Sequence, residues 1–250
     1  MQRFFVKTED KPCKIFITLQ AEKNTVRFCG KCPKTKTFYF LRKKEINGLE
    51  VLEFPLPIAP KIIEIWIEGK CKVKSISLKA LPEPQIKLKK ETYDFIRHIF
   101  EFSKKLNTLG TGIYTDDKGR FPIVLSKQIR NRETGKVMNT PARVSRNTGQ
   151  IEVSQEKFKQ YTVPMRVFVL MHERSHYELQ SSNELECDLQ ALQWYLGFGF
   201  PQTEAIYANT KIFNGNNPEH LDRAEQLLDY IKHYNYATAS YDNGFCGACQ

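Results

Sequence analysis

Two histidines and a glutamate stand at a spacing that suggests metal chemistry, in the segment His172-Glu173-x-x-His176. The five apolar residues Val167–Met171 precede it and indicate a buried helix. Residues four apart share one face of a helix, so both imidazoles can reach the same ion. Zinc binds neutral imidazole nitrogens, and a catalytic zinc site keeps one position open for water. Glu173 follows His172 directly and is placed to act as a general base on that water without binding the metal.

A third ligand is expected one short loop later, in the segment Ser182–Asp188. Asn183 can cap a new helix, which would place Glu184 and Asp188 four residues apart on one face. Glu184 would then complete a His-His-Glu ligand set, and Asp188 could accept the second ring proton of a ligand histidine. Acidic residues in a first helical turn are also favoured by the helix dipole alone. Glu186 and Asp188 remain alternatives to Glu184 as the third ligand.

Together the two segments resemble the active-site motif of the zincin metallopeptidases. The HExxH sequence at residues 172–176, followed by Glu184-x-x-Cys187-Asp188, is similar to the HExxH and ExxAD motifs of the gluzincins related to CAAX-prenyl proteases. Residues 112–234 resemble a minimal zincin domain, which implies a zinc-dependent metallopeptidase that hydrolyses peptide bonds. For individual residues the resemblance implies zinc bound by His172, His176 and Glu184, water activated by Glu173, and a histidine supported by Asp188.

Some features depart from that family pattern. Cys187 replaces the alanine of the motif, and Arg174 puts a charge inside the HExxH segment. Arg174 lies about 200° round the helix from His172, so we expect it to face away from the metal. The chain shows no membrane helix, unlike the CAAX-prenyl proteases, and only the active-site pattern carries over. The resemblance also implies that the strand Gln150–Ser154 is the edge strand beside the cleft, where an extended peptide could pair.

A second resemblance concerns the chain as a whole. A compact zincin-like unit behind a small β domain is similar to virion proteins of tailed phages, including the crAss-like phages of gut bacteria. This implies an alternative function, a structural component of the virion neck or tail that retains a zincin fold with or without proteolytic activity. The N-terminal segment Met1–Lys7 has no signal-peptide core. We therefore expect the protein in the cytoplasm or within a virion.

The seven cysteines are odd in number and too few for a disulfide scaffold. Four lie in two Cys-Gly-x-Cys pairs that each resemble a zinc knuckle, namely Cys29, Cys32, Cys246 and Cys249. Together they could hold a structural zinc, or each pair could be redox-active or without function. The other three are expected to be small buried hydrophobic residues, namely Cys13, Cys71 and Cys187.

The elements that must position these residues change type near residue 85. Residues 1–85 hold short runs rich in β-branched and aromatic residues, separated by turn residues such as Lys23-Asn24 and Asn47-Gly48. The six runs are 15–19, 26–28, 37–41, 51–54, 62–67 and 73–78. They predict an antiparallel β-sandwich or jelly-roll-like domain, followed by a proline-containing linker at Leu81–Gln85. Residues 86–250 combine helical patterns with a few short strands, which predicts an α+β chain. The resemblance implies that this second domain is zincin-like, with a short sheet, an active-site helix and a cysteine-containing tail.

The net charge of +10 is concentrated in the first part of the chain. Residues 1–90 carry 20 Lys/Arg and 9 Asp/Glu, whereas residues 167–250 carry 4 and 11. We expect the basic β domain to bind an acidic protein surface or an assembly partner. No nucleic-acid-binding motif accompanies the lysines, so we do not expect nucleic acid as the partner. No run approaches the roughly 18 apolar residues of a membrane helix, so we do not expect the chain to span a membrane. A second basic stretch, Lys127–Arg132, precedes the cleft strand and could contact a peptide substrate.

Overall fold

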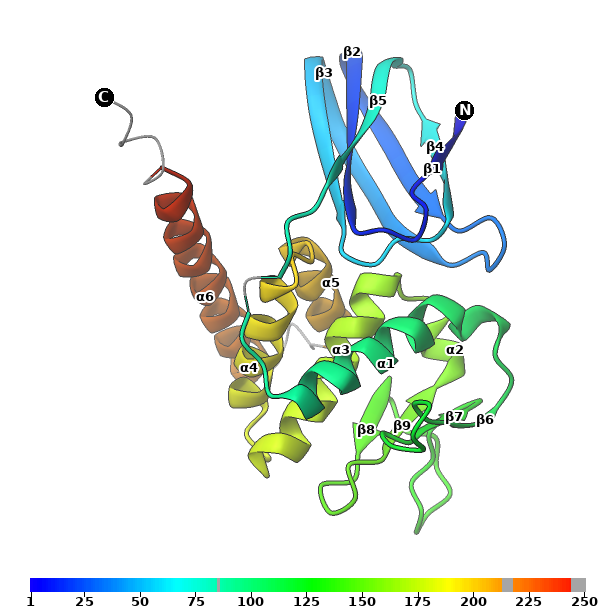
Figure 1. Ribbon diagram of the computed structural model, residues 1–250, viewed down its shortest axis with the longest axis vertical. Coiled ribbons are helices and arrows are strands. Elements are labelled where there is room, and N and C mark those ends of the chain that lie inside the picture. The colour runs from blue at the N-terminus through cyan, green and yellow to red at the C-terminus, as the bar shows by residue number, and fades with distance from the viewer. Residues whose placement is uncertain (85, 213–217, 244–250) are drawn as a thin grey trace.

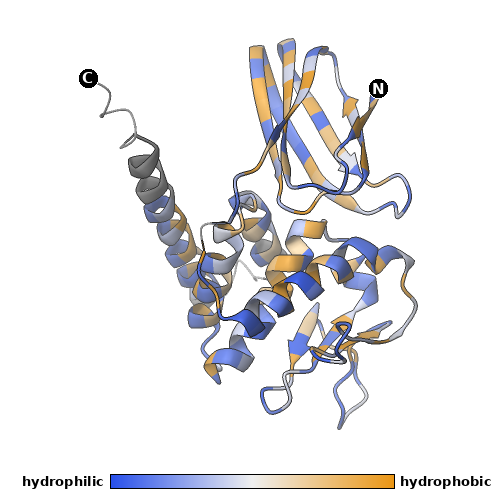
Figure 2. Cartoon of the chain, in the orientation of Figure 1, coloured by the Kyte–Doolittle hydropathy of each residue, from blue (hydrophilic) through white to orange (hydrophobic). Residues whose placement is uncertain are grey.

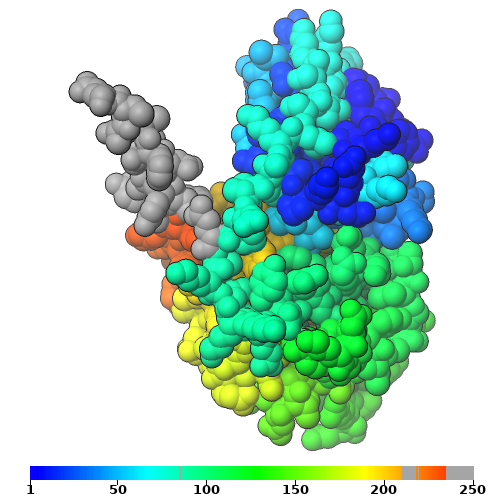
Figure 3. Space-filling view, viewed as in Figure 1, coloured from blue at the N-terminus to red at the C-terminus, as the bar shows by residue number. Residues whose placement is uncertain are grey.

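A computed structural model describes residues 1–84, 86–212 and 218–243 of the chain (Figure 1). The predicted α+β fold is confirmed, because an antiparallel sheet forms the N-terminal part and helices with a second, shorter sheet follow it. In the space-filling view the N-terminal part lies above the helical part (Figure 3). None of the described helices is long and apolar enough to cross a membrane.

The N-terminal sheet is built on one long hairpin. Its strands are β1 (Gln2–Lys7), β2 (Cys13–Lys31), β3 (Phe38–Leu56), β4 (Ile62–Glu68) and β5 (Lys72–Ala80). The order is β1-β4-β2-β3, and β5 pairs with the first half of β2. All pairings are antiparallel.

This sheet folds back on itself to enclose a core. Apolar and polar residues alternate along the strands, as the colours of Figure 2 show, so one face of each long strand can be buried. Phe40 and Phe54 lie near opposite ends of β3, yet their rings stack with centroids 4.1 Å apart. Phe28 of β2 adds a tilted contact to Phe54 at 6.2 Å. The two halves of the hairpin therefore face each other as two layers.

Two predicted turns are wrong, because both lie inside strands. Lys23-Asn24 lies in β2 and Asn47-Gly48 lies in β3. The register shifts between Ala21, which pairs with Gly48, and Asn24, which pairs with Ile46. Gly48 has a φ of 85°, a left-handed conformation that glycine adopts without steric cost. These residues mark the bend of one hairpin. The six expected strands therefore merge into four, and β1 is an additional strand.

The second part of the chain places helices against a short sheet. Its first elements are α1 (Lys90–Lys105), a 3₁₀ turn (Leu106–Thr108), β6 (Gly112–Tyr114), β7 (Ile123–Ser126), β8 (Ala142–Val144) and β9 (Ile151–Ser154). The helices α2 (Gln155–Phe158), α3 (Val163–Leu179), α4 (Glu184–Gly197), α5 (Gln202–Ile212) and α6 (Pro218–Asn243) follow. The sheet order is β6-β7-β9-β8, with β7 and β9 parallel.

The edge strand beside α3 is not the one predicted. Gln150–Ser154 corresponds to β9, which is central in the sheet and pairs on both sides. The edge strand is β8, and it contacts α3. β8 has only three residues, too few for an alternating pattern that would reveal a strand in the sequence.

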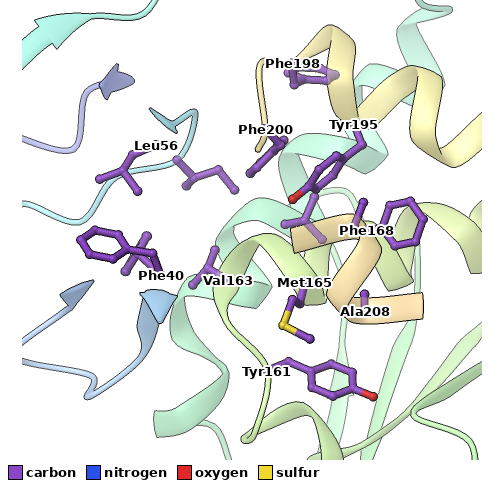
Figure 4. Close-up of a cluster of buried hydrophobic side chains, with 14 of the residues drawn as sticks. Phe40, Leu56, Tyr161, Val163, Met165, Phe168, Tyr195, Phe198, Phe200 and Ala208 are labelled. Carbon is purple, nitrogen blue, oxygen red and sulfur yellow. The ribbon is translucent and has the colours of Figure 1, made fainter. Parts of the chain in front are cut away.

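Side chains from both parts of the chain meet in one buried cluster (Figure 4). Phe40 and Leu56 of β3 lie beside Val163 at the start of α3. At the edge of this cluster Arg42 Nη1 lies 2.5 Å from Oε1 of Glu204, whose side chain is buried. The predicted division at residue 85 stays a prediction, but the core runs across it.

A buried arginine ties α3 to α1. Arg166 is fully buried, and its guanidinium donates hydrogen bonds to the carbonyl oxygens of Phe158 and Ser103, both at 2.8 Å, and to Asn107 Oδ1 at 2.9 Å. Burial lowers the pKa of Arg166 to about 9. The cost of burying this charge is offset only while all three acceptors remain in place.

Replacing Arg166 by methionine is expected to lower the free energy of unfolding by about 3 kcal/mol, because three acceptors, in two buried hydrogen bonds and one part-buried one, lose their donor. Urea unfolding measures this loss. The matched control is Arg97→Met on the exposed side of α1, expected to change stability by less than about 0.5 kcal/mol. Equal urea midpoints for the wild type and Arg166→Met would show that these hydrogen bonds do not hold the two helices together.

Candidate metal centre

Helix α3 is a rigid support for the HExxH segment. Thr162 caps it, with its hydroxyl accepting from Met165 N at 3.4 Å, and a proline occupies its first turn. Every residue from Val163 to Met171 is buried, and Arg166 is the only charged residue among them. The helix ends at Leu179, because Gln180 takes a left-handed φ of 51° and redirects the chain. The predicted helix and its burial are therefore present.

Helix α4 returns beside α3 and brings a carboxylate to the two histidines. Asn183 caps it as predicted, accepting from the backbone N–H groups of Leu185 and Glu186 at 3.1 and 3.2 Å. The cap fixes where the first turn begins, so Glu184 is the first residue of the helix. Its carboxylate faces α3.

The three expected ligand side chains lie together. The Nε2 atoms of His172 and His176 are 3.1 Å apart. The Glu184 carboxylate lies across them, with Oε2 3.4 Å from His172 and Oε1 3.5 Å from His176. Zinc with bonds of about 2.0–2.1 Å in tetrahedral geometry separates its ligand atoms by about 3.3 Å. Donor type and spacing therefore both fit zinc, and within residues 1–84, 86–212 and 218–243 only these three residues form such a group.

Contacts on the far side of each imidazole orient the rings. His176 Nδ1 lies 2.9 Å from the carbonyl oxygen of Ser181, which can only accept, so the proton is on Nδ1 and the lone pair is on Nε2. His172 Nδ1 lies 2.7 Å from Oδ1 of Asp188, a side chain only 1% exposed. Both Nε2 atoms can therefore act as ligands. Asp188 occupies the supporting position that the sequence indicated.

His172 and the carboxylates around it shift one another's pKa values even without a metal. Burial alone would lower the pKa of His172, but contacts to Asp188 and Glu184 outweigh it and raise that pKa to about 10. The same contact with His172 lowers the pKa of Glu184 to about 2. A proton on His172 thus holds the carboxylates in place, and a bound cation would replace that proton.

Glu173 lies in the same cleft, without being part of the ligand group. Its side chain is 9% exposed, and burial raises its pKa to about 7, whereas the charge of His172 acts in the opposite direction. The backbone of Val144 in β8 also interacts with the carboxylate. A buried carboxylate with a pKa near neutrality suits a group that accepts and returns a proton.

The cleft is bounded by α3 on one side and β8 on the other. Its lining includes Ala142, Val144, Arg146, Phe168, Val169 and Asn209, together with the histidines and carboxylates described above. Because β8 is an edge strand, an extended peptide could pair with it beside Glu173. The free strand edge beside the cleft is therefore that of β8 instead of β9.

Arg223 of α6 is a site residue that the sequence reasoning missed. Its Nε lies 3.1 Å from Asp188 Oδ2, and its Nη2 contacts Asp188 and lies 3.3 Å from Glu184 Oε2. It therefore forms ion pairs with both carboxylates that contact His172. One signal was available, because residues 167–250 contain only four cationic side chains to balance their acids.

The other residues considered in the sequence analysis, Glu186, Arg174 and Cys187, lie outside the group formed by His172, His176 and Glu184. Glu186 is exposed and outside the ligand group. Arg174 faces away from the metal site, as expected, with Nε 2.9 Å from Glu178 and its guanidinium 5.1 Å from the ring centre of Phe95. Cys187 Sγ is buried 3.2 Å from Nδ1 of His176, on the side of the ring away from Nε2.

The paired cysteines are only partly described. Cys29 and Cys32 lie at the end of β2 and just after it, and burial raises the pKa of the Cys29 thiol to about 11, which disfavours the thiolate that zinc requires. Cys246 and Cys249 lie outside the described residues. A shared structural zinc therefore stays a prediction. Of the other cysteines, Cys13 is buried as expected and Cys71 is half-buried.

Comparisons of the chain with protein-family models, with curated proteins and with solved structures gave no match.

Proposed function

We propose that this protein is a zinc-dependent metallopeptidase of the zincin class, acting on a peptide or protein substrate. One observation carries the proposal: His172, His176 and Glu184 converge from two helices at zinc-ligand spacing, with Glu173 buried in the same cleft. A bound zinc ion would act as a Lewis acid that polarises water and the peptide carbonyl.

The protein's own residues would move the protons. Glu173 would accept a proton from the attacking water and pass it to the leaving amine, a role that its raised pKa favours. β8 would hold the substrate extended along the cleft through backbone hydrogen bonds. Asp188 and Arg223 would keep His172 and Glu184 oriented without touching the substrate.

Replacing Asp188 by asparagine is expected to weaken zinc binding by about 10- to 100-fold, because His172 loses the carboxylate that orients its ring. Competition with a chromophoric chelator measures the affinity. The matched control is Asp222→Asn on the exposed side of α6, expected to bind zinc as the wild type does. Wild-type affinity in a folded Asp188→Asn variant would remove Asp188 from the account of the site.

A structural role in a phage virion is the second candidate, and the surface of the N-terminal sheet favours it. Leu49 and Val51 project from the same side of β3 and are 65% and 56% exposed. Both residues belong to the part of the chain, residues 1–90, that carries 20 Lys/Arg and 9 Asp/Glu, a balance that favours an acidic partner. We infer that the N-terminal sheet would bind an acidic assembly partner, as a structural component of a virion neck or tail would. Recovery in a stoichiometric ring with other proteins would support this role, whereas a monomer with peptidase turnover would count against it.

A further inference from the structure

One wall of the cleft is strongly basic. Residues 127–146 include β8 and the segments on either side of it, and they contain a single acidic residue, Glu133. They contain six basic residues, namely Lys127, Arg130, Arg132, Lys136, Arg143 and Arg146. A substrate paired with β8 would therefore lie against positive charge.

Three arginines line the cleft itself, and two of them are already paired. Arg143 Nη2 lies 2.6 Å from Glu152, and Arg223 holds Asp188. Arg146 is exposed and makes no ion pair with any acidic residue of the described chain. It is thus the cation in this lining that is available to a substrate.

The backbone around Arg146 is fixed close to the metal centre. Ser145 N donates to the carbonyl oxygen of Gln150 at 2.8 Å and closes the turn between β8 and β9. Gln180 Nε2, at the end of α3, donates to the carbonyl oxygen of Arg146 at 3.0 Å. Gln180 follows the ligand His176 by four residues. The turn that carries Arg146 is therefore tied to the same helix as the metal ligands.

We propose that Arg146 selects substrates with an acidic side chain, Asp or Glu, at one position next to the scissile bond. This inference rests on the proposed peptidase function and names the substrate class for that site. A guanidinium binds a carboxylate through two parallel hydrogen bonds, which a neutral amide cannot match. The other acids of the cleft repel an acidic side chain, so the preference is confined to the subsite beside Arg146.

Peptide binding tests the selection apart from turnover. The zinc-loaded Glu173→Gln variant is titrated with fluorescent ten-residue peptides that carry Glu, Gln or Lys at each position in turn. At one position the Glu peptide is expected to bind about 3- to 10-fold more tightly than the Gln peptide, the range for a partly exposed charge pair. In the Glu173→Gln/Arg146→Glu double variant the preference at that position should reverse toward Lys.

A control substitution distinguishes a direct contact of Arg146 with the peptide from the attraction exerted by the basic surface as a whole. Arg132→Glu makes the same change at an exposed residue outside the lining, so it should lower the affinity for all acidic peptides slightly and leave the position-specific preference intact. Equal binding of Glu and Gln peptides at every position, or an equal effect of both arginine substitutions, would overturn the proposal. Cleavage by the wild type is measured in parallel. A position-specific preference without cleavage would contradict the peptidase function while supporting Arg146 as the selecting residue.

Discussion

Replacing Glu173 by glutamine is expected to reduce the kcat of peptide cleavage by about 10²- to 10⁴-fold, the range for losing a general base. Glutamine has nearly the same shape, but it cannot accept the proton of the attacking water. Zinc affinity should stay close to wild type, because Glu173 lies outside the ligand group. Initial cleavage rates of a peptide library, followed by mass spectrometry, give the ratio.

Glu178→Gln, on the same helix, is the control for the effect of removing a carboxylate from α3. Glu178→Gln also removes one carboxylate from α3, but Glu178 hydrogen-bonds to Thr92 and Arg174 on the side away from the metal. It is expected to keep cleavage within a few-fold of wild type. Full proteolysis by Glu173→Gln would be incompatible with the mechanism proposed for this cleft.

Replacing His176 by alanine is expected to lower zinc affinity by more than about 100-fold, since loss of a direct ligand should cost more than loss of a supporting residue. The two remaining ligands, His172 and Glu184, leave the centre short of the three protein ligands of a catalytic zinc site. Isothermal titration with zinc, or competition with a chelator of known affinity, measures the difference.

The matched control is another histidine on a helix. His233 of α6 is exposed, and its Nδ1 contacts the carbonyl oxygen of Asp229 instead of a ligand group. His233→Ala should bind zinc as the wild type does. If both variants kept one tightly bound zinc per chain, the metal would lie elsewhere, and the paired cysteines would become the first place to look.

The local part of the site was accessible from the sequence. The spacing of His172 and His176 depends only on helix periodicity, and the position of Glu184 depends on the cap at Asn183. The outward direction of Arg174 follows from the same periodicity. Each of these features involves residues close together in the chain, where geometry is fixed by the helix itself.

Features that depend on contacts between residues far apart in the chain could not be predicted from the sequence. Arg223 reaches Asp188 only because α6 packs against α4, and no spacing rule links residues 35 positions apart. β8 is recognisable as a strand only through its pairing with β9. Gly48 has the left-handed φ that glycine favours in turns, but here it lies within the long hairpin, beside the register shift between Ala21 and Asn24.

The most direct test of the account is a zinc titration of the metal-free wild type in which bound zinc and peptide cleavage are followed in the same sample. Cleavage is expected to be absent before zinc is added, and its rate should rise in proportion to occupancy of the centre formed by His172, His176 and Glu184. Cleavage by the metal-free protein, or a fully zinc-loaded centre that cleaves no peptide in the library, would contradict it.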